Sequence, residues 1–252
     1  MDILLLKLVL TPALIGGASL AARRWGHAVS GWLVGLPLSS GPIAFFLALE
    51  RGTSFAAAAA IGSLAGVVAE VAFCIAYAGV ASRVSWPIAL SSGAVAFAVV
   101  AAVLQRPELS LAIAGAGACV SLAVALRLVR RGAARAVMPS PPRWDLPARM
   151  IIATALVLAI TELAPVLGPR WSGMLATFPV YAAILTVFAH RVSVTSAVEV
   201  LRGLLLGLFA FAAFFVVLGM LIERAGVVAA FAAAIVSALA IQAVSFALAV
   251  RA

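Results

Sequence analysis

Apolar runs long enough to cross a membrane recur along the whole sequence. An ideal helix needs about 20 apolar residues to cross the hydrocarbon core of a bilayer. Hydrophobic residues make up 66% of the chain and charged residues only 10%, whereas soluble domains are about 25% charged. The sequence therefore predicts an all-α, polytopic membrane protein whose surroundings are the lipid bilayer. About nine transmembrane helices are expected, at 3–21, 31–49, 54–82, 86–105, 109–128, 149–168, 172–190, 196–222 and 225–250.

The net charge of +9 does not indicate a nucleic-acid partner, because most of the basic residues lie in the connections between apolar runs. No glycine-rich phosphate loop follows a strand, and aromatic residues do not alternate with a basic patch. Cys74 and Cys119 lie inside apolar runs and are interpreted as packing residues. With two histidines and no clustered acids, the sequence gives no reason to expect an enzyme, a metal site or a cofactor.

Charge asymmetry predicts the orientation of the chain in the membrane. Twelve of the 17 basic residues lie on the side that carries the C-terminus, and five lie on the other side: Lys7, Arg51, Arg106, Arg170 and Arg224. Basic residues in short connections stay on the cytoplasmic side. We therefore expect the N-terminus outside and the C-terminus in the cytoplasm, in the inner (plasma) membrane of a bacterium.

The second half of the chain repeats the pattern of the first. The segment "RRWGHAVSGWLVGLPLSSGPIAFF" (23–46) aligns with "PRWSGMLATFPVYAAILTVF" (169–188), and "GSLAG" (62–66) aligns with "GLLLG" (203–207). Five crossings precede the second copy, so the two copies enter the membrane from opposite sides. The expected organisation is one membrane domain, 1–252, with a 4+1+4 inverted-topology repeat. Repeat one is 1–106, a linking helix and basic cytoplasmic linker are 107–148, and repeat two is 149–252.

The segments "SGMLATFPVYAAILTVFAH" and "EVLRGLLLGLF" resemble the GlpM-type small inner-membrane proteins of bacteria. Those are short four-helix chains with a proline in the second helix and a Leu-Arg pair entering the third. The first half resembles them more faintly, since it lacks the Leu-Arg pair. The resemblance implies the architecture and not the activity. This organisation, in which a small four-helix unit also occurs as a fused double, resembles the drug/metabolite transporter superfamily more weakly.

The run 31–49 contains "VGLPLSSGPIAFF" (34–46), whose prolines and glycines are poor residues for a spanning helix. We expect the helix to be interrupted there, which leaves carbonyl groups that need partners or a wet cavity. The run 172–190 has a proline at the matching position. Interrupted helices at matching positions of two repeats indicate a transporter's substrate site, although a kink patched by serine side chains is the plainer reading. The candidate substrate-binding residues are Pro37, Ser39, Ser40, Gly41, Pro42, Pro179 and Tyr181.

Glu70 is the remaining candidate site residue, near the middle of the run 54–82. An acid at the centre of a membrane helix costs about 3 kcal/mol on insertion scales, and burial favours its neutral form. These properties suit a proton or cation site; a protonated acid bonded to a neighbouring helix is the alternative. We expect Glu70 to face a cavity lined by the run 31–49, on its cytoplasmic side, without bonding Ser39.

Two further expectations concern packing and charge. The GxxxG pairs at 62–66 and 203–207 are expected to let helices approach closely. Lys7 is expected to extend to the membrane surface, with a Lys7–Glu162 ion pair as the alternative.

The sequence supports a permease or secondary transporter for a small solute or ion, with proton coupling as one option. The alternative is a non-transport membrane scaffold or accessory protein of envelope metabolism. A homodimer is compatible with either function.

Overall fold

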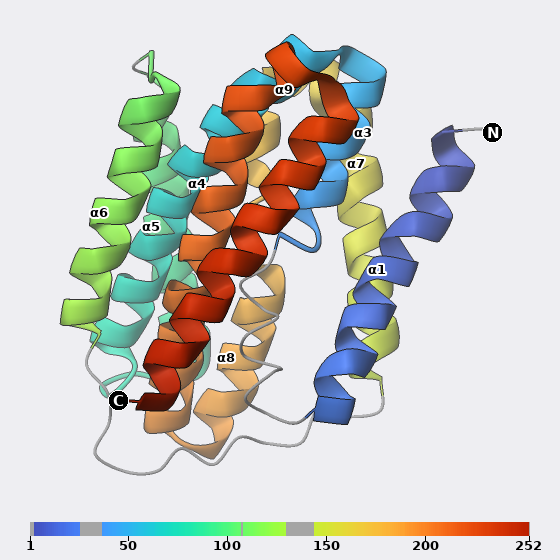
Figure 1. Cartoon of the computed structure of the whole chain (residues 1–252). Helices are drawn as coiled ribbons and strands as arrows, with labels where there is room; N and C mark the ends of the chain where they lie inside the picture. The colour runs from blue at the N-terminus through green and yellow to red at the C-terminus, as the bar shows by residue number, and fades with distance from the viewer. Residues whose placement is uncertain (1–2, 26–36, 107, 130–143, 252) are drawn as a thin grey trace.

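The computed structural model describes residues 3–25, 37–106, 108–129 and 144–251, and every regular element in these ranges is a helix (Figure 1). The predicted all-α class is therefore confirmed. The helices are α1 (Ile3–Trp25), α3 (Ser40–Arg51), α4 (Thr53–Val80), α5 (Trp86–Leu104), α6 (Leu111–Leu128), α7 (Asp145–Leu175), α8 (Val180–Val192) and α9 (Val194–Arg251).

Five of these helices contain stretches long and apolar enough to cross a membrane: Thr53–Val80, Trp86–Leu104, Leu111–Leu128, Leu146–Leu175 and Val194–Val244. Their outward faces are also apolar. Val95 and Val99 on α5, and Val120 on α6, are exposed apolar side chains. Such faces fit lipid rather than water as the surrounding solvent, which supports a membrane location.

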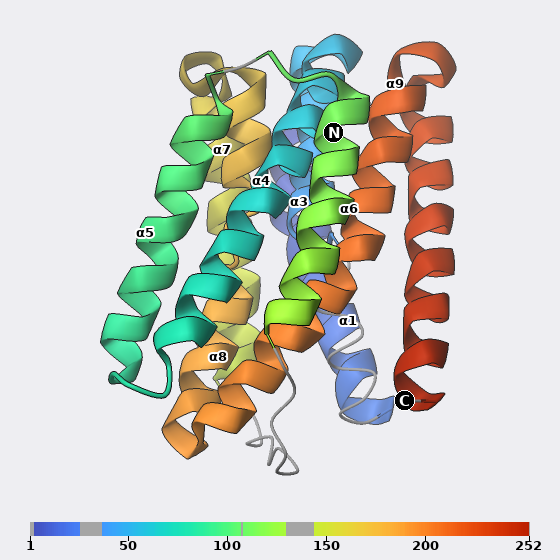
Figure 2. The same cartoon turned by 90° about the vertical axis from the view of Figure 1, so that its left-hand side faces the viewer.

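Three glycines with positive φ reverse or redirect the chain: Gly52 (φ 90°), Gly168 (φ 71°) and Gly226 (φ 77°). Only glycine adopts this conformation readily, because it has no Cβ. At Gly226 the long helix α9 folds back on itself, so that it has a first arm (194–225) and a second arm (227–251) (Figure 1). At Gly168 the helix α7 turns back into a short arm, 169–175 (Figure 2). Gly52 lies between two predicted runs, Gly168 is the last residue of the predicted run 149–168, and Gly226 is the second residue of the predicted run 225–250.

Both predicted interruptions are present. Pro37–Ser39 is non-helical, and α3 begins only at Ser40. Residues 31–36 of the predicted run lie outside the described residues. The predicted run 172–190 is broken between Leu175 and Val180, and Pro179 precedes the first residue of α8. The run 172–190 is therefore a discontinuous helix, and in the described part of the run 31–49 the helix begins only after Pro37–Ser39.

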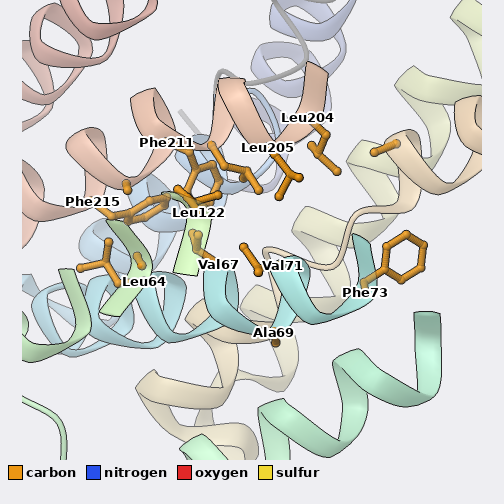
Figure 3. Close-up of a cluster of buried hydrophobic side chains, with 14 of the residues drawn as sticks. Leu64, Val67, Ala69, Val71, Phe73, Leu122, Leu204, Leu205, Phe211 and Phe215 are labelled. Atoms are coloured by element: carbon orange, nitrogen blue, oxygen red, sulfur yellow. The ribbon is translucent and has the colours of Figure 1, made fainter. Parts of the chain in front are cut away.

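The helix α4 lies at the centre of the bundle and contacts α3, α5, α6, α7 and α9. Leu64, Val67 and Val71 on one face of α4 point toward the first arm of α9, which presents Leu205 and Phe211 (Figure 3). Figure 1 shows that α4 and the first arm of α9 run in opposite directions, and that α3 and α8 occupy opposite ends of the bundle. The fold thus surrounds α4 with helices from both halves of the chain.

Candidate functional site

The structure buries Glu70 in the central helix. Its side chain is in the middle of α4, and the residue is only 4% exposed. The helix α4 contains no other acidic or basic residue. Within the described part of the chain, the Glu70 carboxyl makes no hydrogen bond or ion pair. An acid in this environment carries a large desolvation cost when it is charged.

The face of α4 that carries Glu70 packs against the interrupted segment of the second half. The Ser63 hydroxyl donates a hydrogen bond to the Gly173 carbonyl across 3.2 Å. One turn later, Gly66 approaches Thr177 so closely that a Cβ on Gly66 would lie 2.1 Å from the Thr177 Oγ1. Helical spacing places Glu70 on the same face, one turn beyond Gly66. Glu70 therefore follows directly after the contact with the interruption between α7 and α8.

Near the C-terminal end of α4, the same face is joined to α8 by a hydrogen bond between Tyr77 and His190. The Tyr77 hydroxyl lies 2.9 Å from the His190 Nδ1, and the two rings meet edge-on at 5.7 Å. Because Gly66 meets Thr177 and Tyr77 meets His190, α4 and α8 run in the same direction. The N-terminal end of α8 consequently comes level with the turn of α4 that carries Glu70. A helix N-terminus carries partial positive charge, which favours a nearby carboxylate.

The first interruption forms a different kind of site. A cavity of about 380 Å³ lies between α1, the start of α3 and both arms of α9. Three of the candidate residues line it: Pro37, Gly41 and Pro42. The other lining residues are also apolar, and they include Phe45, Phe214 and Phe231.

The remaining candidate residues divide between the two interruptions. Ser40 is buried and Ser39 is half-buried, and neither lines the cavity. Pro179 is buried at the start of α8; the side chain of Tyr181 lies outside the described residues.

Glu70 does not line the cavity at the first interruption, and it makes no hydrogen bond with Ser39 or Ser40. The cavity at the first interruption and Glu70 are therefore separate features, and Glu70 lies one helical turn beyond the contact of Gly66 with the second interruption.

A buried charge cluster at the end of the bundle that carries Gly52 was not anticipated in full. Lys7 is 1% exposed, so the expectation that it extends to the membrane surface is wrong. Its Nζ lies 2.6 Å from the Glu50 Oε1 and 3.6 Å from the Glu162 Oε1, and it donates to the Thr161 hydroxyl across 2.8 Å. The cluster joins α1, α3 and α7. A usable signal was present in the sequence, because Glu50 stands next to Arg51, which is predicted on the same membrane side as Lys7.

The GxxxG prediction is confirmed for α4. A Cβ on Gly62 would lie 2.1 Å from the carbonyl oxygen of Arg170, so the backbones touch. A Cβ on Gly203, in contrast, would meet nothing within 4 Å.

Among the described residues, no group of three or more His, Cys, Asp or Glu side chains is arranged to hold a metal ion. No protein-family model, curated protein or solved structure matches the chain. The function must therefore be inferred from the geometry of the two interruptions and of Glu70.

Proposed function

We propose that the protein is a secondary transporter that moves a small solute or ion and couples this movement to protons through Glu70. One observation carries the proposal: Glu70 is a buried acid with no charged partner among the described residues, and helical spacing places it one turn beyond the contact between Gly66 and Thr177. Ionisable residues inside membranes are costly and commonly mark ion or proton pathways. Discontinuous helices are where transporters bind substrates and coupling ions.

The geometry supplies a physical reason for coupling. Protonated Glu70 is neutral and suits the apolar packing of α4, whereas the carboxylate needs a polar partner. The partial positive charge at the N-terminal end of α8 is such a partner. In this proposal, α8 changes its position at the 176–179 interruption that precedes it. The protonated and the deprotonated forms of Glu70 therefore favour different positions of α8 relative to α4.

We also propose nine crossings in a 4+1+4 inverted repeat, with GlpM-like halves and the N-terminus outside the inner membrane. Three observations support it. The helices α3 and α8 each follow an interruption that contains proline. They lie toward opposite ends of the bundle, and the long helices that follow them run in opposite directions (Figure 1). The basic residues favour the side of the C-terminus.

The test is proton movement in liposomes that contain the purified protein and a trapped pH-sensitive dye. A panel of small organic cations, anions and neutral solutes is added outside, one at a time. We expect one solute class to cause a proton flux in the wild type. Glu70→Gln keeps the shape and removes the ionisable group, so it should abolish this flux while the protein remains folded. Glu108→Gln is the matched control, because Glu108 is exposed in the α5–α6 connection, and it should behave as the wild type.

Two results would contradict the proposal. A flux that Glu70→Gln leaves intact removes Glu70 from the mechanism. A folded wild type that moves no proton with any solute class favours the alternative, a membrane scaffold or accessory protein of envelope metabolism.

A further inference from the structure

The two interruptions face chemically different partners. At the second interruption, the central helix presents Gly66 and the acid Glu70. At the first, the first arm of α9 presents Phe214, whose ring lies 3.8 Å from the position of a Cβ on Gly41. No acid comparable to Glu70 is among the described residues that line the apolar cavity at the first interruption.

Among the described residues, the lining of the cavity contains no polar side chain. Phe45 and Phe231 meet edge-on at 5.4 Å, and Phe231 and Phe214 at 5.9 Å, so three rings form one wall. A polar or charged solute would lose its hydration there without gaining a hydrogen bond. An apolar ligand loses nothing of this kind and gains dispersion contacts with the walls.

The cavity reaches the lipid-facing surface of the bundle. Ile235 and Leu239 line it from the second arm of α9, and they are 50% and 44% exposed. Leu10 of α1 lines the cavity as well. The gap between α1 and the second arm of α9 therefore opens sideways into the bilayer, where hydrocarbon is the solvent at this depth.

We propose that this cavity binds one hydrocarbon chain of a membrane lipid, which enters from the bilayer between α1 and the second arm of α9. The volume of about 380 Å³ is within the usual range of ligand pockets, about 300–1,000 Å³. The binding is independent of the proposed proton coupling, because Glu70 does not line the cavity.

Gly41 provides a direct way to test the site. A Cβ built there has ordinary contacts, 3.8 Å to Phe214 and 3.9 Å to Pro37, and both of these residues line the cavity. An alanine at position 41 fits without displacing its neighbours. Larger side chains extend from this point into the space that the lipid chain occupies.

The experiment uses the full chain in vesicles of phosphatidylethanolamine and phosphatidylglycerol. A small fraction of the phosphatidylglycerol carries a photoreactive diazirine in one acyl chain, and the labelled peptides are mapped after illumination. The outer face of α5, with Val95 and Val99, provides the internal reference, since it contacts bulk lipid only along a shallow surface. We expect labelling of Phe45 and of the 231–239 stretch to exceed that reference.

Gly41→Leu should reduce the labelling of the cavity residues about tenfold relative to α5, because the ligand loses its buried apolar area. Gly41→Ala should retain the labelling, and Gly41→Val should give an intermediate loss. Gly79→Leu is the control: a Cβ there meets nothing within 4 Å, and the position is exposed. It should leave the labelling unchanged. If Gly41→Leu does not fold, the Gly41→Val comparison decides the matter.

The proposal is overturned if the cavity residues are labelled no more than α5, or if the Gly41 series has no effect in folded protein. A water-soluble photoreactive alkylamine is tested in parallel. If this probe labels the cavity and the lipid does not, the cavity binds a free amphipathic solute and not a lipid chain.

Discussion

The Tyr77 hydroxyl and the His190 Nδ1 lie 2.9 Å apart, and this hydrogen bond ties the central helix to the last turn of α8. Tyr77 is fully buried, and its bond is the polar contact that anchors the end of α8 away from the interruption. Two contacts relate α4 to α8 and to the interruption before it: the approach of Gly66 to Thr177, and this hydrogen bond.

Replacement of Tyr77 by phenylalanine should lower the free energy of unfolding by about 1 kcal/mol, the usual net value of one hydrogen bond. His190→Leu should cost a similar amount in the wild type and much less when Tyr77→Phe is already present. Equilibrium unfolding in mixed micelles gives all four values of this double-mutant cycle. Additive costs would show that the two side chains do not act through a shared bond.

Gly173→Ala should be strongly destabilising. A Cβ at this position would lie 1.9 Å from the carbonyl oxygen of Ala59 and 2.9 Å from the Ser63 nitrogen, both backbone atoms. The helices must separate to admit the methyl group, and overpacking of this kind costs about 3 kcal/mol or more.

Gly203→Ala is the matched control, because a Cβ on Gly203 has open space. Inside a helix, this change should stabilise by about 0.5–1 kcal/mol. Thermal unfolding followed by circular dichroism measures both variants, and equal effects would contradict the close approach at Gly173.

Lys7→Met should destabilise the protein by about 3 kcal/mol, because it leaves the partly buried Glu50 carboxylate without its cation. The double variant Lys7→Met/Glu50→Leu should recover most of that loss, since an apolar pair can replace a buried ion pair. Glu162→Gln should have a small effect, because the Glu162 side chain is 73% exposed. The same unfolding assay applies. A double variant less stable than Lys7→Met would show that Glu50 has another role.

Reporter fusions test the proposed orientation. A reporter fused after residue 135 should behave as cytoplasmic, and one fused after residue 107 as periplasmic, because basic connections are retained in the cytoplasm. Alkaline phosphatase, which is active only in the periplasm, and a fluorescent protein that folds in the cytoplasm give opposite signals. Reversed signals at both positions would contradict the orientation and the number of crossings between them.

The sequence alone determined the backbone features of this protein. The predicted break in the run 31–49 is present at Pro37–Ser39, and the proline of the second run stands directly before α8. Of the three positive-φ glycines, Gly52 lies between two predicted runs, and Gly168 and Gly226 lie within the first or last two residues of one. These features are local: proline lacks the amide donor that a helix needs, and glycine lacks the Cβ that forbids positive φ. Their effect does not depend on which helix is nearby.

Only the tertiary structure decided which side chains meet. It placed Glu70 one helical turn beyond the contact between Gly66 and Thr177 rather than in the cavity at Pro37, and it buried Lys7 against Glu50. In a soluble protein, the pattern of apolar and polar residues shows which face of a helix is buried. In a bilayer, the faces toward lipid and toward the bundle are both apolar, so the pattern leaves the rotation of each helix undetermined. Close packing at small residues such as Gly66 and Gly173 fixes that rotation.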